Sequence, residues 1–127
     1  MNRYYFSLLI CFKKEIDLVA LEKMLKLEGS KLTPLSESRG LPENKTAKLY
    51  FKTKEYAGVY SDDDFSKFVE MVHEKCKNLG EILKEYDGRI ELDVVFTTLE
   101  EKPCLSLSEK TVKNLSDLGA SFDVDFI

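Results

Sequence analysis

The sequence ends on LSLSEKTVKNLSDLGASFDVDFI, residues 105–127, in which a helix pattern is followed by a strand pattern. Its first half has the signals of a short helix, because Ser108 is a favoured N-cap residue and Gly119 is a favoured residue just after a helix. Apolar residues between these two recur at helical spacing and predict a buried face made of Val112, Leu115 and Leu118.

The second half of the stretch alternates between apolar and acidic residues. This pattern predicts a strand that buries Phe122, Val124 and Phe126 and leaves Asp123 and Asp125 outside. A strand so late in the chain must pair with an existing sheet, since its backbone groups would otherwise lack hydrogen-bond partners. We expect it to lie in the same sheet as a strand over 90–98. Leu105 and Leu107 are expected to close a strand or its extension.

Upstream, the sequence alternates between strand and helix patterns. Residues 4–12 are apolar on both alternations, which is typical of a central strand. Residues 31–38 fit an edge strand, because Pro34 cannot donate to a central ladder, and residues 39–45 are expected to form an exposed loop. A helix is expected from Asp17 to Gly29, and one long helix over 62–86, capped by Ser61 and ended by Gly88. A strand is expected over 47–56, and its solvated face carries Lys48, Tyr50, Lys52 and Lys54.

The resulting element order, β-α-β-β-α-β-α-β, predicts an α+β fold. Its first six elements match a ferredoxin-like βαββαβ core, and a C-terminal αβ extension follows. We expect a mostly antiparallel sheet with the helices packed on one face. The chain of 127 residues fits a single domain, 1–127.

Charge is distributed unevenly along the chain. The net charge is −4, yet residues 81–127 alone carry five basic and eleven acidic residues. This balance disfavours a nucleic-acid binder, which would be basic, and it allows a basic protein partner.

The apolar run near Arg3 is followed by Lys13 and Lys14 without a cleavage site, and it is too short to span a membrane. We therefore expect a cytoplasmic protein.

The residue types that usually carry catalysis or metal binding are sparse. Cys11, Cys76 and Cys104 are too far apart for a metal knuckle or a redox pair, so we expect three free thiols, with Cys11 and Cys76 buried. His73 is the only histidine and has no partner at ligand spacing. Residues 62–64, three aspartates, suit the positive end of a helix dipole. The sequence therefore predicts no enzyme, no cofactor and no metal.

Four carboxylates remain as candidate binding residues. Glu91 and Asp93 share one face of the strand over 90–98, and Asp123 and Asp125 share one face of the last strand. If these strands are neighbours, the four form one patch, which could be a solvated sheet face, a protein-binding surface or a metal site. Arg39, in the loop with Ser36 and Ser38, lacks the Gly-rich turn before a helix that a phosphate site would need.

The quoted ending closely resembles the C-terminal signature of a bacterial domain-of-unknown-function family, the one numbered 4279. Its members end with a leucine-serine strand, a short Leu-rich helix, Leu-Gly-Ala and an alternating acidic strand. The segment LKLEGSKLTPLSESRG is similar to the family's Leu-Gly-x-x-Pro-Thr segment, with Lys26 in place of glycine, and Tyr50 stands where tryptophan is common. The resemblance implies a small bacterial protein without established enzymology, and similar proteins resemble immunity proteins encoded beside toxins.

Together these observations predict a non-enzymatic cytosolic binding protein. Its most concrete form is an immunity protein that occludes a cognate toxin, possibly a basic nuclease, through Glu91, Asp93, Asp123 and Asp125. The alternative is a small-molecule-binding or regulatory α+β domain with its ligand on the open sheet face.

Overall fold

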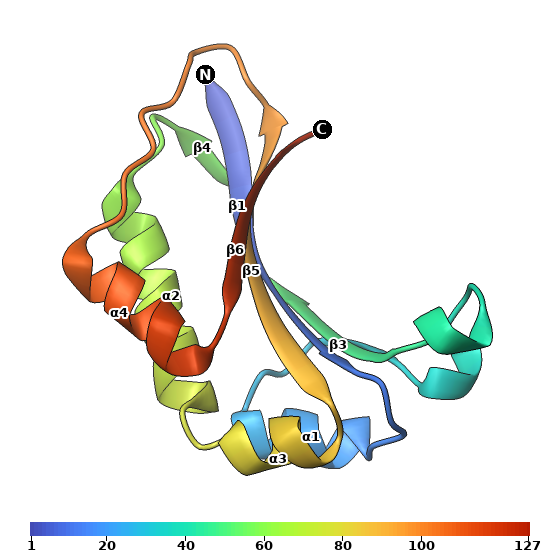
Figure 1. Ribbon diagram of the computed structural model, residues 1–127. Helices are drawn as coiled ribbons and strands as arrows, with labels where there is room; N and C mark the ends of the chain where they lie inside the picture. The colour runs from blue at the N-terminus through green and yellow to red at the C-terminus, as the bar shows by residue number, and fades with distance from the viewer.

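The computed structural model describes residues 1–127 as an α+β fold built on one six-stranded sheet (Figure 1). The strands are β1 (Asn2–Phe12), β2 (Lys31–Thr33), β3 (Ala47–Lys52), β4 (Tyr56–Gly58), β5 (Gly88–Thr98) and β6 (Ser121–Phe126). The α-helices are α1 (Leu18–Leu25), α2 (Asp62–Cys76), α3 (Gly80–Glu85) and α4 (Glu109–Leu118), and two 3₁₀ turns are η1 (Leu35–Glu37) and η2 (Pro42–Asn44).

The sheet runs in the order β2-β3-β1-β5-β6, and β4 pairs with the first residues of β1. The central position of the first strand is therefore confirmed, as is the placement of the last strand in the same sheet. All pairs are antiparallel except β5 and β6, which are parallel and make the sheet mixed. A parallel pair needs a crossover connection, and the segment with α4 provides it.

One hydrophobic cluster of 23 buried residues joins the sheet to the helices. The even-numbered side chains of β1 from Tyr4 to Phe12 point into it, and α2 and α4 lie side by side over this face (Figure 1). Phe65 of α2 packs against Phe6 of β1 with ring centroids 5.4 Å apart and against Phe122 of β6 at 5.0 Å. The phenylalanine face of the last strand is thus anchored in the core, although Phe126 at its end stays 55% exposed while stacking on Phe96.

The prediction of one helix over 62–86 is wrong, because the helix breaks between Cys76 and Gly80. Leu79 is buried at the break, and its N–H still donates to the Cys76 carbonyl, so a tight turn replaces the α-helical ladder. Glycine is among the weakest helix formers, which favours a break at this point. The apolar spacing from Cys76 through Leu79 to Leu83 survives the turn, which explains why the sequence pattern did not reveal it.

The segment between β5 and α4 contains no strand, contrary to expectation for Leu105 and Leu107, which are 42% and 37% exposed. Polar contacts hold it instead. The buried Asn2 side chain accepts from the N–H groups of Glu100 and Glu101 and donates to the Glu101 carbonyl. Further on, the N–H and hydroxyl of Ser106 both donate to the Asp62 carboxylate.

Three smaller predictions also need correction. Val112 is 50% exposed, and the buried face of α4 is formed by Thr111, Leu115 and Leu118. Ser61 occupies the N-cap position of α2 but makes no side-chain capping bond, whereas Ser108 accepts from the Thr111 N–H as expected. The strand expected over 47–56 is two strands, because the chain leaves β3 after Lys52 and reaches β4 at Tyr56.

Candidate functional site

The face of the sheet opposite α2 and α4 carries most of the polar side chains of the strands. We call it the open face, and it presents the odd-numbered residues of β1, β2, β5 and β6 and the even-numbered residues of β3. Its β2–β3 half is basic, with Lys31, Lys48 and Lys52, and its β5–β6 half is acidic. The open face is therefore divided by charge along the central strand.

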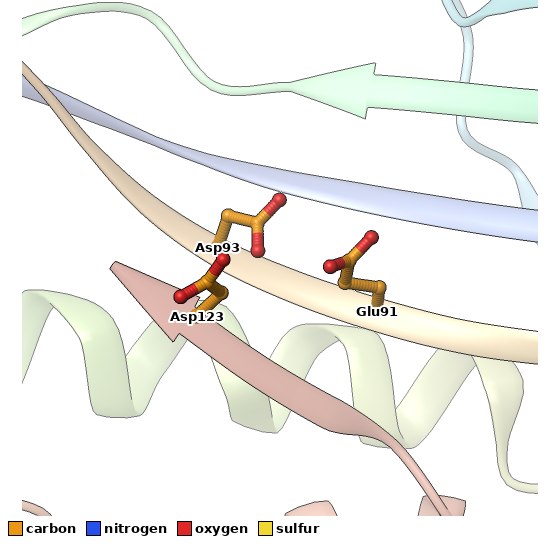
Figure 2. A group of neighbouring side chains, drawn as sticks. All are labelled: Glu91, Asp93 and Asp123. Atoms are coloured by element: carbon orange, nitrogen blue, oxygen red, sulfur yellow. The ribbon is translucent and has the colours of Figure 1, made fainter. Parts of the chain in front are cut away.

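The four carboxylates predicted as binding residues do lie together on this face. Asp93 pairs directly with Asp123 across the parallel β5–β6 ladder, while Glu91 and Asp125 precede and follow that pair along their strands. Figure 2 shows Glu91, Asp93 and Asp123 rising from the same side of the two strands. We call these four residues the acidic cluster.

Three members of the acidic cluster could share one positively charged ligand. Glu91, Asp93 and Asp123 each offer a carboxylate oxygen, and these oxygens lie within 4.8 Å of one another. Hard cations such as Ca²⁺ and Mg²⁺ take oxygen ligands of this kind. An arginine or lysine of a protein partner would satisfy the same oxygens, since its N–H groups form charge-assisted hydrogen bonds with carboxylates.

Asp93 is the least solvated member of the acidic cluster. Its Oδ1 is inaccessible to solvent and has no hydrogen-bond partner. Burial, followed by the charges of Glu91, Asp125 and Asp123, raises the pKa of the Asp93 carboxyl to about 6, while the Ser7 hydroxyl opposes the rise. Because burial and the neighbouring charges outweigh the Ser7 hydrogen bond, the cluster loses negative charge as the pH falls through about 6.

Side chains of the central strand separate the acidic cluster from the basic half of the face. Ser7 and Cys11 are buried there, at 2% and 4% exposure. Burial and the Tyr5 hydroxyl raise the pKa of Tyr50 to about 12, so this phenol stays protonated at neutral pH. Burial also raises the pKa of the Cys11 thiol, against the opposing effects of Arg89 and Lys48. Cys11 is therefore buried, as expected, but on the open face rather than in the main core.

The remaining residues noted in the sequence lie elsewhere. His73 Nε2 is 3.4 Å from Asp117 Oδ2, so this histidine joins α2 to α4 on the helical side. The three aspartates at 62–64 form the first turn of α2, as expected, and Asp64 accepts from the Tyr4 hydroxyl at 3.3 Å. Cys76 is buried and Cys104 is exposed, and all three cysteines are free. His73, residues 62–64 and Cys76 belong to α2, on the face of the sheet opposite the acidic cluster.

The comparison with protein families identifies the chain. The model of the family described as Domain of unknown function (DUF4279) matches residues 2–127. The chain belongs to this family. The resemblance carried by residues 105–127 is thereby confirmed over nearly the whole length of this DUF4279 protein. No curated protein and no solved structure matches it significantly. Its helices are all too short or too polar to cross a membrane.

Sequence reasoning missed one feature of the open face. Lys31, Arg39 and Lys48 come together around a cleft, although they belong to β2, a loop and β3. The alternation of Lys48 with Leu49 did place that lysine on the polar face, and the sequence favoured a solvated role for it. No pattern in the sequence indicated that residues 34–40 fold beside it.

Proposed function

We propose that this DUF4279 protein is a non-enzymatic binding protein whose acidic cluster docks a basic surface of a protein partner. The observation that carries the proposal is the β5–β6 register, which aligns Asp93 with Asp123 and adds Glu91 and Asp125 on the same face. The cluster consists of carboxylates alone, and the only histidine, His73, belongs to α2 on the helical side of the sheet, so we infer a role in binding rather than catalysis.

The environment of Asp93 supports a role in binding rather than simple solvation. An ionised carboxylate with an inaccessible, unpartnered oxygen destabilises the free protein. A guanidinium or ammonium group from a partner would offset that cost, because charge-assisted hydrogen bonds are among the strongest that proteins form. The exposed Asp123 and Asp125 would guide the approach of such a partner by long-range attraction.

In its most specific form, the proposal is that the protein is an immunity protein acting in the cytoplasm on a cognate toxin. A nuclease toxin is basic where it grips phosphates. An acidic surface placed over that region would block the substrate and also speed association. The surplus of six acidic residues in residues 81–127 supports this form.

We also infer that strands β1, β2, β3 and β5 form a ferredoxin-like core. The order β2-β3-β1-β5 and the antiparallel pairing of all three neighbours support this arrangement. The α4–β6 unit then extends the core and contributes half of the acidic cluster.

The test is co-purification with the product of the adjacent gene. The affinity-tagged chain and this product are co-expressed, and the complex is compared for the native protein and the double variant Asp123→Asn/Asp125→Asn. A matched control, Glu15→Gln/Glu28→Gln, removes two exposed carboxylates far from β6. We expect the complex to form with the native protein and the control, and to be lost or depleted with the aspartate variant. Equal recovery in all three would reject the proposed surface.

A further inference from the structure

A second candidate site lies on the basic half of the open face. The chain between β2 and β3 projects from the sheet on the side opposite α2 and α4, as the cyan-to-green segment of Figure 1 shows. The first part of this segment and the strands beneath it enclose a cleft of about 580 Å³. Its lining comprises Leu9, Lys31, Thr33, Glu37, Ser38, Arg39, Lys48 and Tyr50.

The cleft gathers positive charge that no ion pair of the protein engages. Lys31 pairs with Tyr50 across the β2–β3 ladder, and Lys48 is two residues from Tyr50, so the two lysines are diagonal neighbours on one face. Arg39 approaches from the projecting segment. None of the five ion pairs in the structure includes these three cations, and Glu37 is the only acidic residue of the lining.

The loop that supplies Arg39 is fixed at its base. Ser38 is buried, and its hydroxyl oxygen accepts a hydrogen bond from the Thr46 N–H at 3.1 Å, which ties the two ends of residues 38–46 together. The Ser38 hydroxyl keeps its proton free to donate to a further acceptor. Arg39, immediately after this anchor, is thereby held near Lys31 and Lys48 without an acidic partner.

A neighbouring hollow on the same face does not share this surplus of positive charge. That hollow, of about 400 Å³, includes Lys13 and Arg89 but also Glu43 and Asp87, so its charges balance. The cleft, by contrast, combines three cations with one carboxylate. Its floor also includes Leu9 and the ring of Tyr50, which offer apolar surface to an organic group.

From this arrangement we propose that the cleft binds a small organic phosphate. Arginine and lysine are the side chains that bind phosphate oxygens, arginine by a planar fork and lysine as a point charge. The volume is in the range of small-molecule sites, which combine apolar walls with a few placed polar groups. Glu37 can accept hydrogen bonds from sugar hydroxyls of the ligand. This proposal is independent of the protein-binding role of the acidic cluster.

The experiment is an NMR titration of the full chain with ADP, pyrophosphate and adenosine at constant ionic strength. Amide shifts locate the binding, and the variants Lys31→Gln and Lys48→Gln test the two lysines. Lys52→Gln is the matched control, because Lys52 lies on the same face of β3 but outside the cleft. Well-dispersed spectra establish that each variant is folded.

We expect ADP to give saturable shifts at residues 31–39 and 48–50, pyrophosphate to bind the same residues more weakly, and adenosine not to bind. Each cleft variant weakens ADP binding roughly tenfold, the effect of one charge-assisted hydrogen bond, and Lys52→Gln changes it less than about twofold.

Absence of saturation at about 10 mM ADP overturns the proposal. Shifts spread over all surface lysines, or an equal loss with Lys52→Gln, also overturn it. Loss of partner binding by the acidic-cluster variant leaves these outcomes unaffected.

Discussion

At Gly88 the backbone of β5 passes so close to the Phe12 ring that a Cβ there would force neighbouring atoms to shift. A Cβ built there would lie 2.6 and 2.7 Å from two ring carbons and 2.9 Å from Leu83 Cδ2. Phe12 is completely buried, so it cannot yield easily. The sequence suggested that Gly88 ends a helix, but helix α3 ends at Glu85, and Asp87 takes the left-handed conformation before the strand. The reason for glycine here is close packing.

We therefore expect Gly88→Ala to lower the free energy of unfolding by about 2–3 kcal/mol, the usual cost of overpacking a core. Urea denaturation monitored by circular dichroism measures the change. Gly80→Ala is the matched control, because nothing lies within 4 Å of a Cβ at Gly80 and alanine favours the helix. A Gly88 variant as stable as the native protein would show that the Phe12 contact can relax.

Asp93 gives a pH-dependent prediction at the same scale. Its pKa is raised from 3.8 to about 6 in the folded protein, chiefly by burial. A carboxyl with a raised folded pKa stabilises the fold below pH 3.8, and that contribution is lost as the pH rises through about 6. The full shift corresponds to about 3 kcal/mol. Solvent screening at this partly exposed carboxyl reduces it to about 1 kcal/mol.

The variant Asp93→Asn should therefore gain about 1 kcal/mol relative to the native protein between pH 4 and pH 7.5. Urea unfolding at the two pH values measures this difference. Carbon-13 NMR of the carboxyl groups gives an independent check, with a midpoint near 6 for Asp93 in the native protein. A midpoint near 4, with parallel pH dependences for the two proteins, would contradict the account of this residue.

Among the elements, the segment between β5 and α4 is held by two sets of polar contacts of unequal strength. Asn2 is 3% exposed and makes three hydrogen bonds with the backbone of residues 100–101, whereas the Ser106–Asp62 contacts are exposed. The buried set fixes the start of the crossover that brings β6 parallel to β5. Neither set follows a local sequence pattern, since Asn2 lies 98 residues from Glu100.

We expect Asn2→Ala to lower the free energy of unfolding by about 2–3 kcal/mol, because it removes three hydrogen bonds that the buried Asn2 side chain makes in a partly shielded environment. Ser106→Ala, the exposed counterpart, should cost less than about 1 kcal/mol. Thermal unfolding of both variants gives the comparison. Similar small losses for the two variants would mean that packing, not Asn2, positions the crossover.

The sequence predicted the elements well where burial alone decides them. The two-sided apolar pattern of β1 and the one-sided alternation of β5 and β6 identified their faces, because an alternating pattern specifies which residues point inward. The sequence-based prediction failed where an apolar pattern at helical spacing continued through a change in backbone conformation. The stripe from Phe65 to Leu83 persists through the break at residues 77–79, and Val112 fits helical spacing although Thr111 faces α2.

For the whole molecule, the same reasoning explains what could be foreseen of the candidate sites. Strand faces follow from the sequence, so the acidic residues of β5 and of β6 could each be assigned to one face. Their union into one cluster depends on strand order, which brings Asp93 beside Asp123. The basic cleft depends in addition on where residues 34–40 fold, and no periodic pattern specifies that. The result is an open face with one acidic and one basic half.

The central claim is that the acidic half binds a basic protein. The most direct measurement is surface plasmon resonance of the native chain and of Asp123→Asn/Asp125→Asn against the purified product of the adjacent gene, at 50 and 300 mM salt. Exposed charges are screened within about 8 Å near physiological ionic strength. We therefore expect slower association at high salt, and for the variant slower association at low salt with little loss of stability. Association and dissociation rates unchanged by both the salt and the double substitution would contradict it.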